Sequence, residues 1–219
     1  MSKVEAGQIG VFKGKTGQTV VANWRGILVG RKTPTKSNKP GSDEQKDQRS
    51  KFGLITRFFR GLGDIVKLGY QYQKTGPTPM NAAVQYNLEN AVTGEYPQYA
   101  LNYGKIVLSN PFGGGEIDPG FAPTIVSSAG CMVKVSWQVV DNATKGSSPE
   151  DRLSLIIYSV TRKKFIVYER VVPRSALTYE IGLPYLFKGD DCHGYIFFTS
   201  PKGKSVSQSE YLGQFKVLA

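Results

Sequence analysis

Residues that build metal sites and catalytic dyads are scarce in this sequence, which has one histidine and two cysteines among 219 residues. The run Asp190-Asp191-Cys192-His193 gathers four candidate ligands, but neighbouring strand residues point to opposite faces and cannot close a tetrahedral site without a distant partner. For the same reason Cys192 is poorly placed to act as a nucleophile with His193. No pair of carboxylates has a spacing that indicates acid–base catalysis. The sequence therefore predicts neither an enzyme nor a metal site nor a bound cofactor.

Long apolar runs are also absent. No stretch approaches 18 consecutive apolar residues, which excludes a transmembrane helix, and the first ten residues lack the apolar segment of a secretory signal. We therefore expect a soluble protein made in the cytoplasm, with a virion or another particle as its location after assembly. Methionine is rare, whereas the 25 aromatic residues and the 37 glycines and prolines favour a mainly β chain rich in turns.

Acidic residues are few in the first third of the chain. Residues 1–80 hold 15 Lys and Arg against five Asp and Glu, a net charge of +10, whereas residues 81–219 have a net charge of +1. A basic segment on a near-neutral body is typical of proteins that bind a polyanion, whether nucleic acid, anionic lipid or an acidic protein face. The alternative is that these lysines only keep a glycine-rich arm in solution.

Residues 1–43 form this basic arm. Two short apolar runs, Thr19–Asn23 and Ile27–Val29, flank Trp24-Arg25-Gly26 and predict a β-hairpin within residues 8–30. Because a lone hairpin is marginal in water, we expect it to pack on another element or on a neighbouring subunit. The segment Gly10–Thr16 looks like a phosphate-binding loop, but it is one residue too short and lacks the flanking strand and helix, so we interpret it as a flexible turn.

Residues 44–95 are predicted to be helical. After a polar linker at 31–43, Ser42 and Gln45 fit a capping box, and residues 44–74 then carry apolar residues at the spacing of one helical face. Basic residues occupy the opposite face, and a weaker signal indicates a short helix within 81–95. Three interpretations of the basic face stay open: it contacts nucleic-acid phosphates, it lies on an anionic membrane, or it is simply solvated while the apolar face packs on the protein.

The candidate polyanion-binding residues lie on the arm and on the basic face of this helix. They are Lys13, Lys15, Arg25, Arg31, Lys32, Lys46, Arg49, Arg57, Arg60 and Lys67.

Residues 96–219 are predicted to form an antiparallel β-sandwich. Alternating patterns between turn-rich stretches indicate strands at 98–108, 131–140, 153–160, 164–172, 176–183, 194–199 and 206–217. In the second of these, Trp137 shares the face of Val133 and Val135, which should be the core face. The fold class expected is mainly β, with a hairpin and one amphipathic basic helix before the sandwich.

Two parts of the chain resemble known families. The V-K-V-S-W run ending at Trp137, Tyr158, and the passage from Leu183-Pro184 to Tyr195 are similar to fibronectin type III domains, and this resemblance covers residues 100–217. It implies an immunoglobulin-like sandwich that serves as a binding or spacing module. The N-terminal third resembles an uncharacterised bacterial protein family through F-K-G-K-T-G, W-R-G and Q-x-x-Q-R-x-K-F, which suggests that arm, helix and sandwich form one unit.

The two cysteines, Cys131 and Cys192, begin the second and sixth predicted strands. In an immunoglobulin-like sandwich these strands start at the same end of the core, so a disulfide is geometrically feasible. A reducing compartment favours two buried thiols instead.

The leading hypothesis is a non-catalytic structural protein, a subunit of a larger virion- or tail-like assembly whose basic arm faces nucleic acid or a neighbouring subunit. Its partners would be copies of itself or other structural subunits, together with DNA or RNA, and a membrane is disfavoured. The second hypothesis is a soluble nucleic-acid-binding protein that uses the basic face of helix 44–74.

Overall fold

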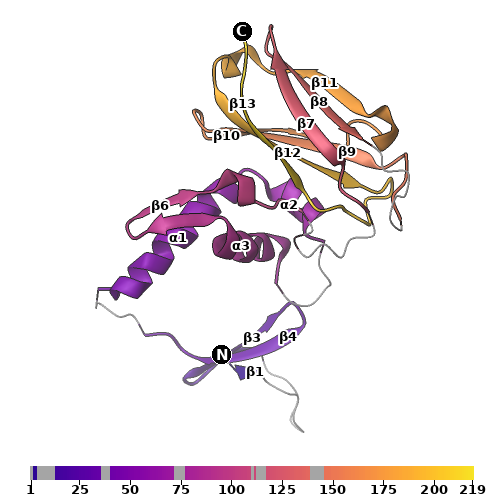
Figure 1. Ribbon diagram of the computed structural model, residues 1–219. Coiled ribbons are helices and arrows are strands. Elements are labelled where there is room, and N and C mark those ends of the chain that lie inside the picture. Colours follow the sequence, from indigo (N-terminus) through magenta and orange to yellow (C-terminus); the bar gives the residue numbers. More distant parts are fainter. Residues whose placement is uncertain are drawn as a thin grey trace.

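The computed structural model describes residues 2–3, 13–35, 40–71, 77–109, 111, 117–138 and 146–219. Three parts follow one another along the chain, and Figure 1 shows them in the same order across the molecule. A small N-terminal sheet, which we call the arm sheet, lies on one side of three helices, the helical layer. A β-sandwich lies on the other side of that layer.

The arm sheet has four antiparallel strands in the order β1-β4-β3-β2. They are β1 (Ser2–Lys3), β2 (Gly14–Thr16), β3 (Thr19–Trp24) and β4 (Ile27–Lys32). The β3–β4 turn places Arg25 and Gly26 at φ values of 49° and 87°, and the Asn23 side chain accepts a hydrogen bond from the Gly26 amide at 2.8 Å. Two successive positive φ values suit the right-handed twist of a tight hairpin. The predicted hairpin is confirmed, although residues 8–12 and linker residues 36–39 lie outside the described part of the chain.

The helical layer consists of α1 (Asp43–Phe59), α2 (Gly63–Gly69) and α3 (Pro79–Asn90). The Ser42 side chain accepts a hydrogen bond from the Gln45 amide, as the capping pattern predicts. The single helix predicted for 44–74 is wrong, because the chain turns after Arg60 and Leu62 has φ of −116°. Glycines on both sides of Leu62 weaken the helix there, and the bend lets Leu62 become buried.

A second hairpin belongs with the helices. It joins β5 (Val92–Glu95) to β6 (Gln98–Leu101), and β6 lies against α1. The stretch 98–108 was predicted as the first strand of the sandwich, and the structure corrects this: after β6 it forms a short 3₁₀ helix, η1 (Tyr103–Lys105). A domain boundary between residues 95 and 96 would fall in the turn of this hairpin, and the division into units 1–43, 44–95 and 96–219 stays a prediction.

The sandwich is built from seven strands in two antiparallel sheets, in the orders β11-β8-β7 and β10-β9-β12-β13. They are β7 (Phe121–Ser128), β8 (Met132–Gln138), β9 (Arg152–Ser159), β10 (Lys164–Tyr168), β11 (Thr178–Gly182), β12 (Asp191–Thr199) and β13 (Glu210–Lys216). Two 3₁₀ turns, η2 (Arg174–Ala176) and η3 (Tyr185–Phe187), complete it. The chain therefore has a mainly β fold with a fibronectin type III-like sandwich, as expected, but β7 rather than 98–108 is its first strand and three helices precede it.

The four-stranded sheet is covered on both faces. On β9, Leu155 and Ile157 enter the core between the two sheets, whereas Ile156 and Tyr158 point to the helical layer. Strand β12 alternates in the same way. This explains why both strands are buried almost continuously, and it makes the sandwich and the helical layer together three layers thick. No helix of the described residues is long and apolar enough to cross a membrane.

Candidate polyanion-binding surface

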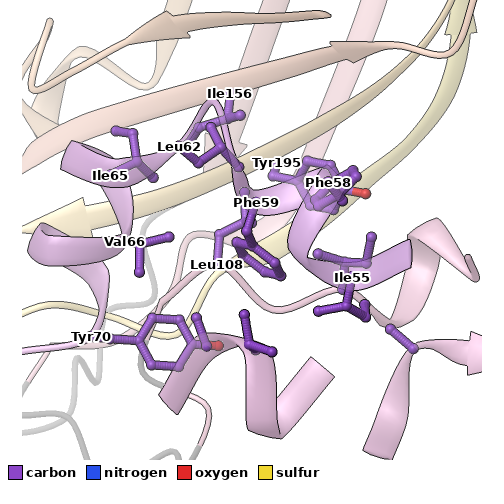
Figure 2. Packing of buried hydrophobic residues seen from close by; sticks show 14 of the residues in the cluster. Ile55, Phe58, Phe59, Leu62, Ile65, Val66, Tyr70, Leu108, Ile156 and Tyr195 are labelled. Carbon is purple, nitrogen blue, oxygen red and sulfur yellow. The ribbon is translucent and has the colours of Figure 1, made fainter. Parts of the chain in front are cut away.

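Helix α1 is fixed to the sandwich by its apolar face. Ile55, Phe58 and Phe59 are buried in the core that the helices share with β9 and β12 (Figure 2). The Phe58 ring meets the rings of Tyr158 and Phe165 edge-on, with centroids 4.9 and 5.0 Å apart. These contacts orient the helix, so they also decide which of its residues face away from the protein.

Four basic residues, Lys46, Arg49, Arg57 and Arg60, line the other side of α1, and we call them the basic stripe. All four are exposed. At roughly 100° per residue, their mean direction lies about 170° around the helix axis from the buried face. The stripe is about 21 Å long at 1.5 Å per residue. The sequence prediction of a basic face opposite an apolar face therefore holds for α1.

The four residues of the basic stripe differ in whether an acidic side chain already neutralises them. Lys46 is paired with Asp43 at 2.8 Å, an exposed contact three residues apart that adds little stability. Arg49, Arg57 and Arg60 form no ion pair with any residue in the described ranges. Three guanidinium groups on this side of α1 thus have no carboxylate among the described residues to neutralise them.

Lys67 is separated from the stripe. It lies on α2, after the bend, and pairs with Asp64 at 3.2 Å. The continuous helix assumed in the sequence analysis would have placed it on the same face. The structure therefore keeps four of the five helical candidates together and moves the fifth to another helix.

The five candidates of the arm form a second group. Lys15 and Arg31 both stand opposite Val20 in neighbouring strands, so they share one face of the arm sheet, while Lys32 lies on the other face. Lys13 is exposed beside β2. Arg25, in the β3–β4 turn, donates a hydrogen bond to the carbonyl of Pro77 at 2.6 Å, which links the arm sheet to the residue before the cap of α3.

An aromatic residue accompanies the arm cations. Trp24 lies on the same face as Lys15 and Arg31 and is 43% exposed. An indole beside two cations could stack on a base or insert into a partner surface. The sequence pattern predicts Trp24 in the turn, and its common face with the cations follows only from the observed register.

A cluster between α1 and β6 was missed by sequence reasoning. Asp47 accepts a short hydrogen bond from the Tyr99 hydroxyl and pairs with Lys51 at 2.8 Å, and Lys51 also lies 4.9 Å from the centre of the Tyr99 ring. Hydrogen bonds from Lys51 and Tyr99 lower the pKa of Asp47, and the bond to Asp47 raises the pKa of Lys51. Because all three groups satisfy one another, the cluster holds the β5–β6 hairpin on α1.

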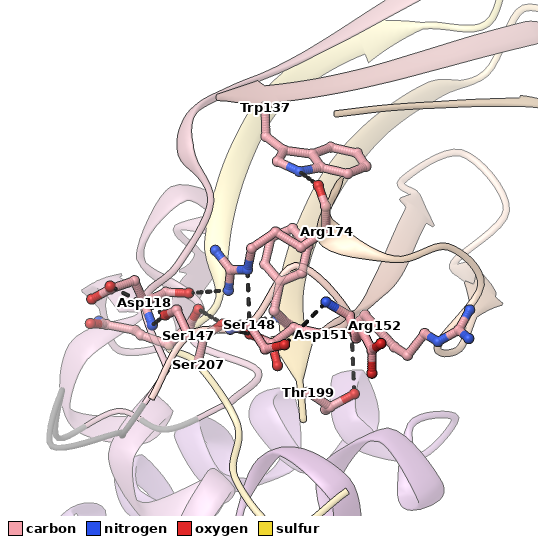
Figure 3. Close-up of polar contacts among 12 residues, drawn as sticks. Asp118, Trp137, Ser147, Ser148, Asp151, Arg152, Arg174, Thr199 and Ser207 are labelled. Carbon is pink, nitrogen blue, oxygen red and sulfur yellow. Dashed lines mark hydrogen bonds and ion pairs between the residues drawn. The ribbon is translucent and has the colours of Figure 1, made fainter. Parts of the chain in front are cut away.

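A buried ion pair closes the end of the sandwich nearest the helices (Figure 3). Arg174 Nε lies 3.4 Å from Asp151 Oδ2, its Nη2 donates to the carbonyl of Asp118 at 2.6 Å, and its guanidinium lies 4.0 Å above the Phe198 ring. Trp137 Nε1 donates to the Arg174 carbonyl at 2.9 Å. Burial lowers the pKa of Arg174, and Asp151 and Asp118 oppose this shift. The cluster joins five segments of the chain, and no spacing in the sequence predicts it.

The Asp190–His193 run is divided between the two sides of its sheet. Asp190 accepts a hydrogen bond from Ser159 and pairs with Arg162, both at 2.8 Å. Cys192 enters the core between the sheets, while His193 stacks on Tyr103 with centroids 4.2 Å apart. In the part of the chain that is described, no three His, Cys, Asp or Glu side chains gather where they could hold a metal ion.

The disulfide that the sandwich geometry would permit between the two cysteines is not formed. Cys131 and Cys192 are both buried and both free thiols. Burial, reinforced by Asp190 and Asp191, raises the pKa of Cys192 to about 12. The alternative of two buried thiols is the one the structure shows.

Fold and surface together define a class: a fibronectin type III-like sandwich carrying a helical layer with an outward basic stripe. The chain belongs to a protein family described as a family of unknown function, DUF6266, which matches residues 11–213. The match includes arm, helices and sandwich. Among solved structures, the chain is similar to the fibronectin type III domain of human collagen alpha-1(XX), with 12% identity, a TM-score of 0.35, and coverage of 50% of this chain and 93% of that domain. No curated protein matches the sequence.

Proposed function

We propose that this protein is a non-catalytic subunit of a larger assembly, in which the arm sheet contacts a neighbouring subunit or nucleic acid and the sandwich supplies a rigid body. The observation that carries the proposal is that the arm sheet has almost no core. Among its described residues, Val21 is the one apolar side chain that is buried, while Trp24 is exposed. A small sheet needs an apolar face packed on something to persist in water. A partner covering Trp24 would supply that contact.

The edges of the arm sheet support the same proposal. Strand β2 has three residues and is the outer strand on its side, so its outward backbone groups pair with no other described strand and would suit pairing with another chain. The hydrogen bond from Arg25 to Pro77 attaches the sheet at its turn, away from the β2 edge, and no described strand pairs with that edge.

A second candidate function is a nucleic-acid-binding protein that acts without assembly through α1. The basic stripe favours it, since Arg49, Arg57 and Arg60 are exposed and form no ion pair with a described residue. Binding would then depend steeply on salt, because each neutralised phosphate releases counterions.

Deletion of residues 1–40 tests the first candidate, and it leaves the Ser42 cap of α1 in place. We expect the full chain to give a multimer in light scattering and the deleted chain to give a folded monomer with an unchanged unfolding midpoint. An assembled deletion variant would contradict the proposal. A full-length monomer that binds nucleic acid in a salt-dependent way would favour the second candidate.

A pair of point variants refines this test. Trp24→Glu introduces a charge on the face that carries Lys15 and Arg31, and Thr19→Glu introduces the same charge on the opposite face. Assembly should fail with the first substitution and persist with the second. Equal behaviour of the two would show that the Trp24 face is not the contact.

A further inference from the structure

Gly53 occupies the interior of α1 without a reason in the fold. Glycine is, after proline, the least favourable residue inside a helix. A Cβ added at Gly53 would have no atom of the described residues within 4 Å, so no contact in that part of the chain requires a glycine there. Gly69 differs, because a Cβ at that position would lie 2.3 Å from the Leu108 carbonyl oxygen. The close packing of the helical layer therefore explains Gly69 and leaves Gly53 unexplained.

Gly53 lies in the middle of the basic stripe. By helical geometry it points in the mean direction of the four stripe residues, with Lys46 and Arg49 before it and Arg57 and Arg60 after it. The stripe thus has a side-chain-free centre between two pairs of cations. Such a gap lets another backbone come close to the helix, as glycine does where main chain must approach a ligand.

We propose that α1 binds the sugar–phosphate backbone of nucleic acid across Gly53, with Arg49 on one side and Arg57 and Arg60 on the other holding phosphates. This inference rests on the proposed polyanion contact and specifies its partner and its point of closest approach. Guanidinium groups match phosphate geometry with two parallel hydrogen bonds, which a lysine ammonium does not reproduce. Contacts of this kind position a duplex without reading its sequence.

The buried face of α1 argues against a membrane as the polyanion. A helix that binds lipid inserts its apolar face between the headgroups. In α1 that face is already used, because Ile55, Phe58 and Phe59 are buried against the sheet. Phe52, 53% exposed, is the one large apolar side chain of the helix left outside. Charge alone would then have to hold the protein on a bilayer.

Fluorescence anisotropy with a labelled DNA duplex of mixed sequence tests the proposal on the full chain. Gly53→Leu fills the gap without changing any charge, and we expect it to weaken binding by about tenfold or more. Gln48→Leu is the matched control, because it places the same side chain at an exposed position of α1 about 140° away from the stripe. It should bind as the wild type does. Gly53→Ala should bind with intermediate affinity while raising the unfolding midpoint, which separates binding from folding.

Arginine variants distinguish the close approach at Gly53 from the polyanion contact of α1. In the triple substitution of Arg49, Arg57 and Arg60 by Gln, binding should be lost and the salt dependence should flatten. Loss in this variant together with wild-type affinity of Gly53→Leu would overturn the close-approach inference and leave the polyanion contact standing. Wild-type affinity in both variants would overturn the polyanion role of α1 itself. Binding to vesicles of anionic lipid without binding to the duplex would also overturn the inference.

Discussion

The ring of Phe58 on α1 meets the ring of Tyr158 on β9 edge-on, with their centroids 4.9 Å apart. This contact joins the helical layer to the sandwich, and Phe165 on β10 extends it. Because the apolar face of α1 is held here, the basic stripe must point away from the body. The orientation of the proposed binding surface therefore depends on the packing beneath it.

Removal of the Phe58 ring should destabilise the protein. We expect Phe58→Ala to lower the free energy of unfolding by about 3–5 kcal/mol, since it deletes a buried ring and leaves a cavity. Urea unfolding followed by circular dichroism measures the change. Phe52→Ala is the control on the same helix, and because Phe52 is exposed its effect should stay within about 0.5 kcal/mol. Equal losses in the two variants would contradict the described packing of α1.

Because the ion pair of Arg174 with Asp151 is buried, removal of one partner alone should strongly destabilise the protein. Arg174→Met leaves the Asp151 carboxylate buried without its cation, and we expect a loss of about 3–5 kcal/mol in the free energy of unfolding. Adding Asp151→Asn should restore part of this loss, because no unpaired charge then remains. Arg152→Met, at the neighbouring exposed arginine, should have little effect. An additive double variant would show that the two residues do not interact.

His193 should make the protein less stable in mild acid. Burial against Tyr103 and Tyr211 lowers its pKa below the ordinary value of 6.5, and Asp191 opposes this only in part. The unfolded chain therefore binds the proton at higher pH than the folded chain, so stability falls as pH drops through about 6.5 and levels off below the folded pKa. Denaturant titrations of the wild type and His193→Gln at several pH values would show this difference. A wild type that gains stability relative to the variant in acid would contradict it.

The two cysteines should be unreactive until the protein unfolds. Both are buried, and the pKa of Cys192, about 12, leaves almost no thiolate near neutral pH. Ellman's reagent should detect no thiol in the native protein and two per chain in guanidinium without reductant. Detection of none after unfolding would indicate a disulfide between Cys131 and Cys192.

Local patterns predicted the parts of the fold that local chemistry determines. Ser42 and Gln45 marked the start of α1, because a capping hydrogen bond involves residues three positions apart. Alternation around Trp137 marked β8, because one face of this strand is core and the other is solvent. The stripe was predictable for the same reason, since a helix of this length repeats its faces regularly.

Features that depend on distant contacts were not predictable from the sequence. The sequence does not predict β7, because the inward side chains of this strand are only half-buried. Within 98–108 only Gln98–Leu101 form a strand, and this strand pairs with β5 rather than with the sandwich. The bend at Leu62 depends on the burial of this side chain in a core shared with β9 and β12. The spacing of apolar residues along one helix gives no information about such distant contacts. The pairing of Arg174 with Asp151 brings together residues from separate turns, and no motif encodes it.

The most direct test of the central claim is the light-scattering mass of the full chain on a sizing column at low and high salt, with absorbance recorded at 260 and 280 nm. A subunit with a basic arm should elute as a large species that carries nucleic acid at low salt. At high salt it should shed the nucleic acid and stay assembled, because its subunit contacts involve Trp24 and backbone edges rather than phosphates. A monomer free of nucleic acid at every salt concentration would contradict both the assembly and the polyanion contact.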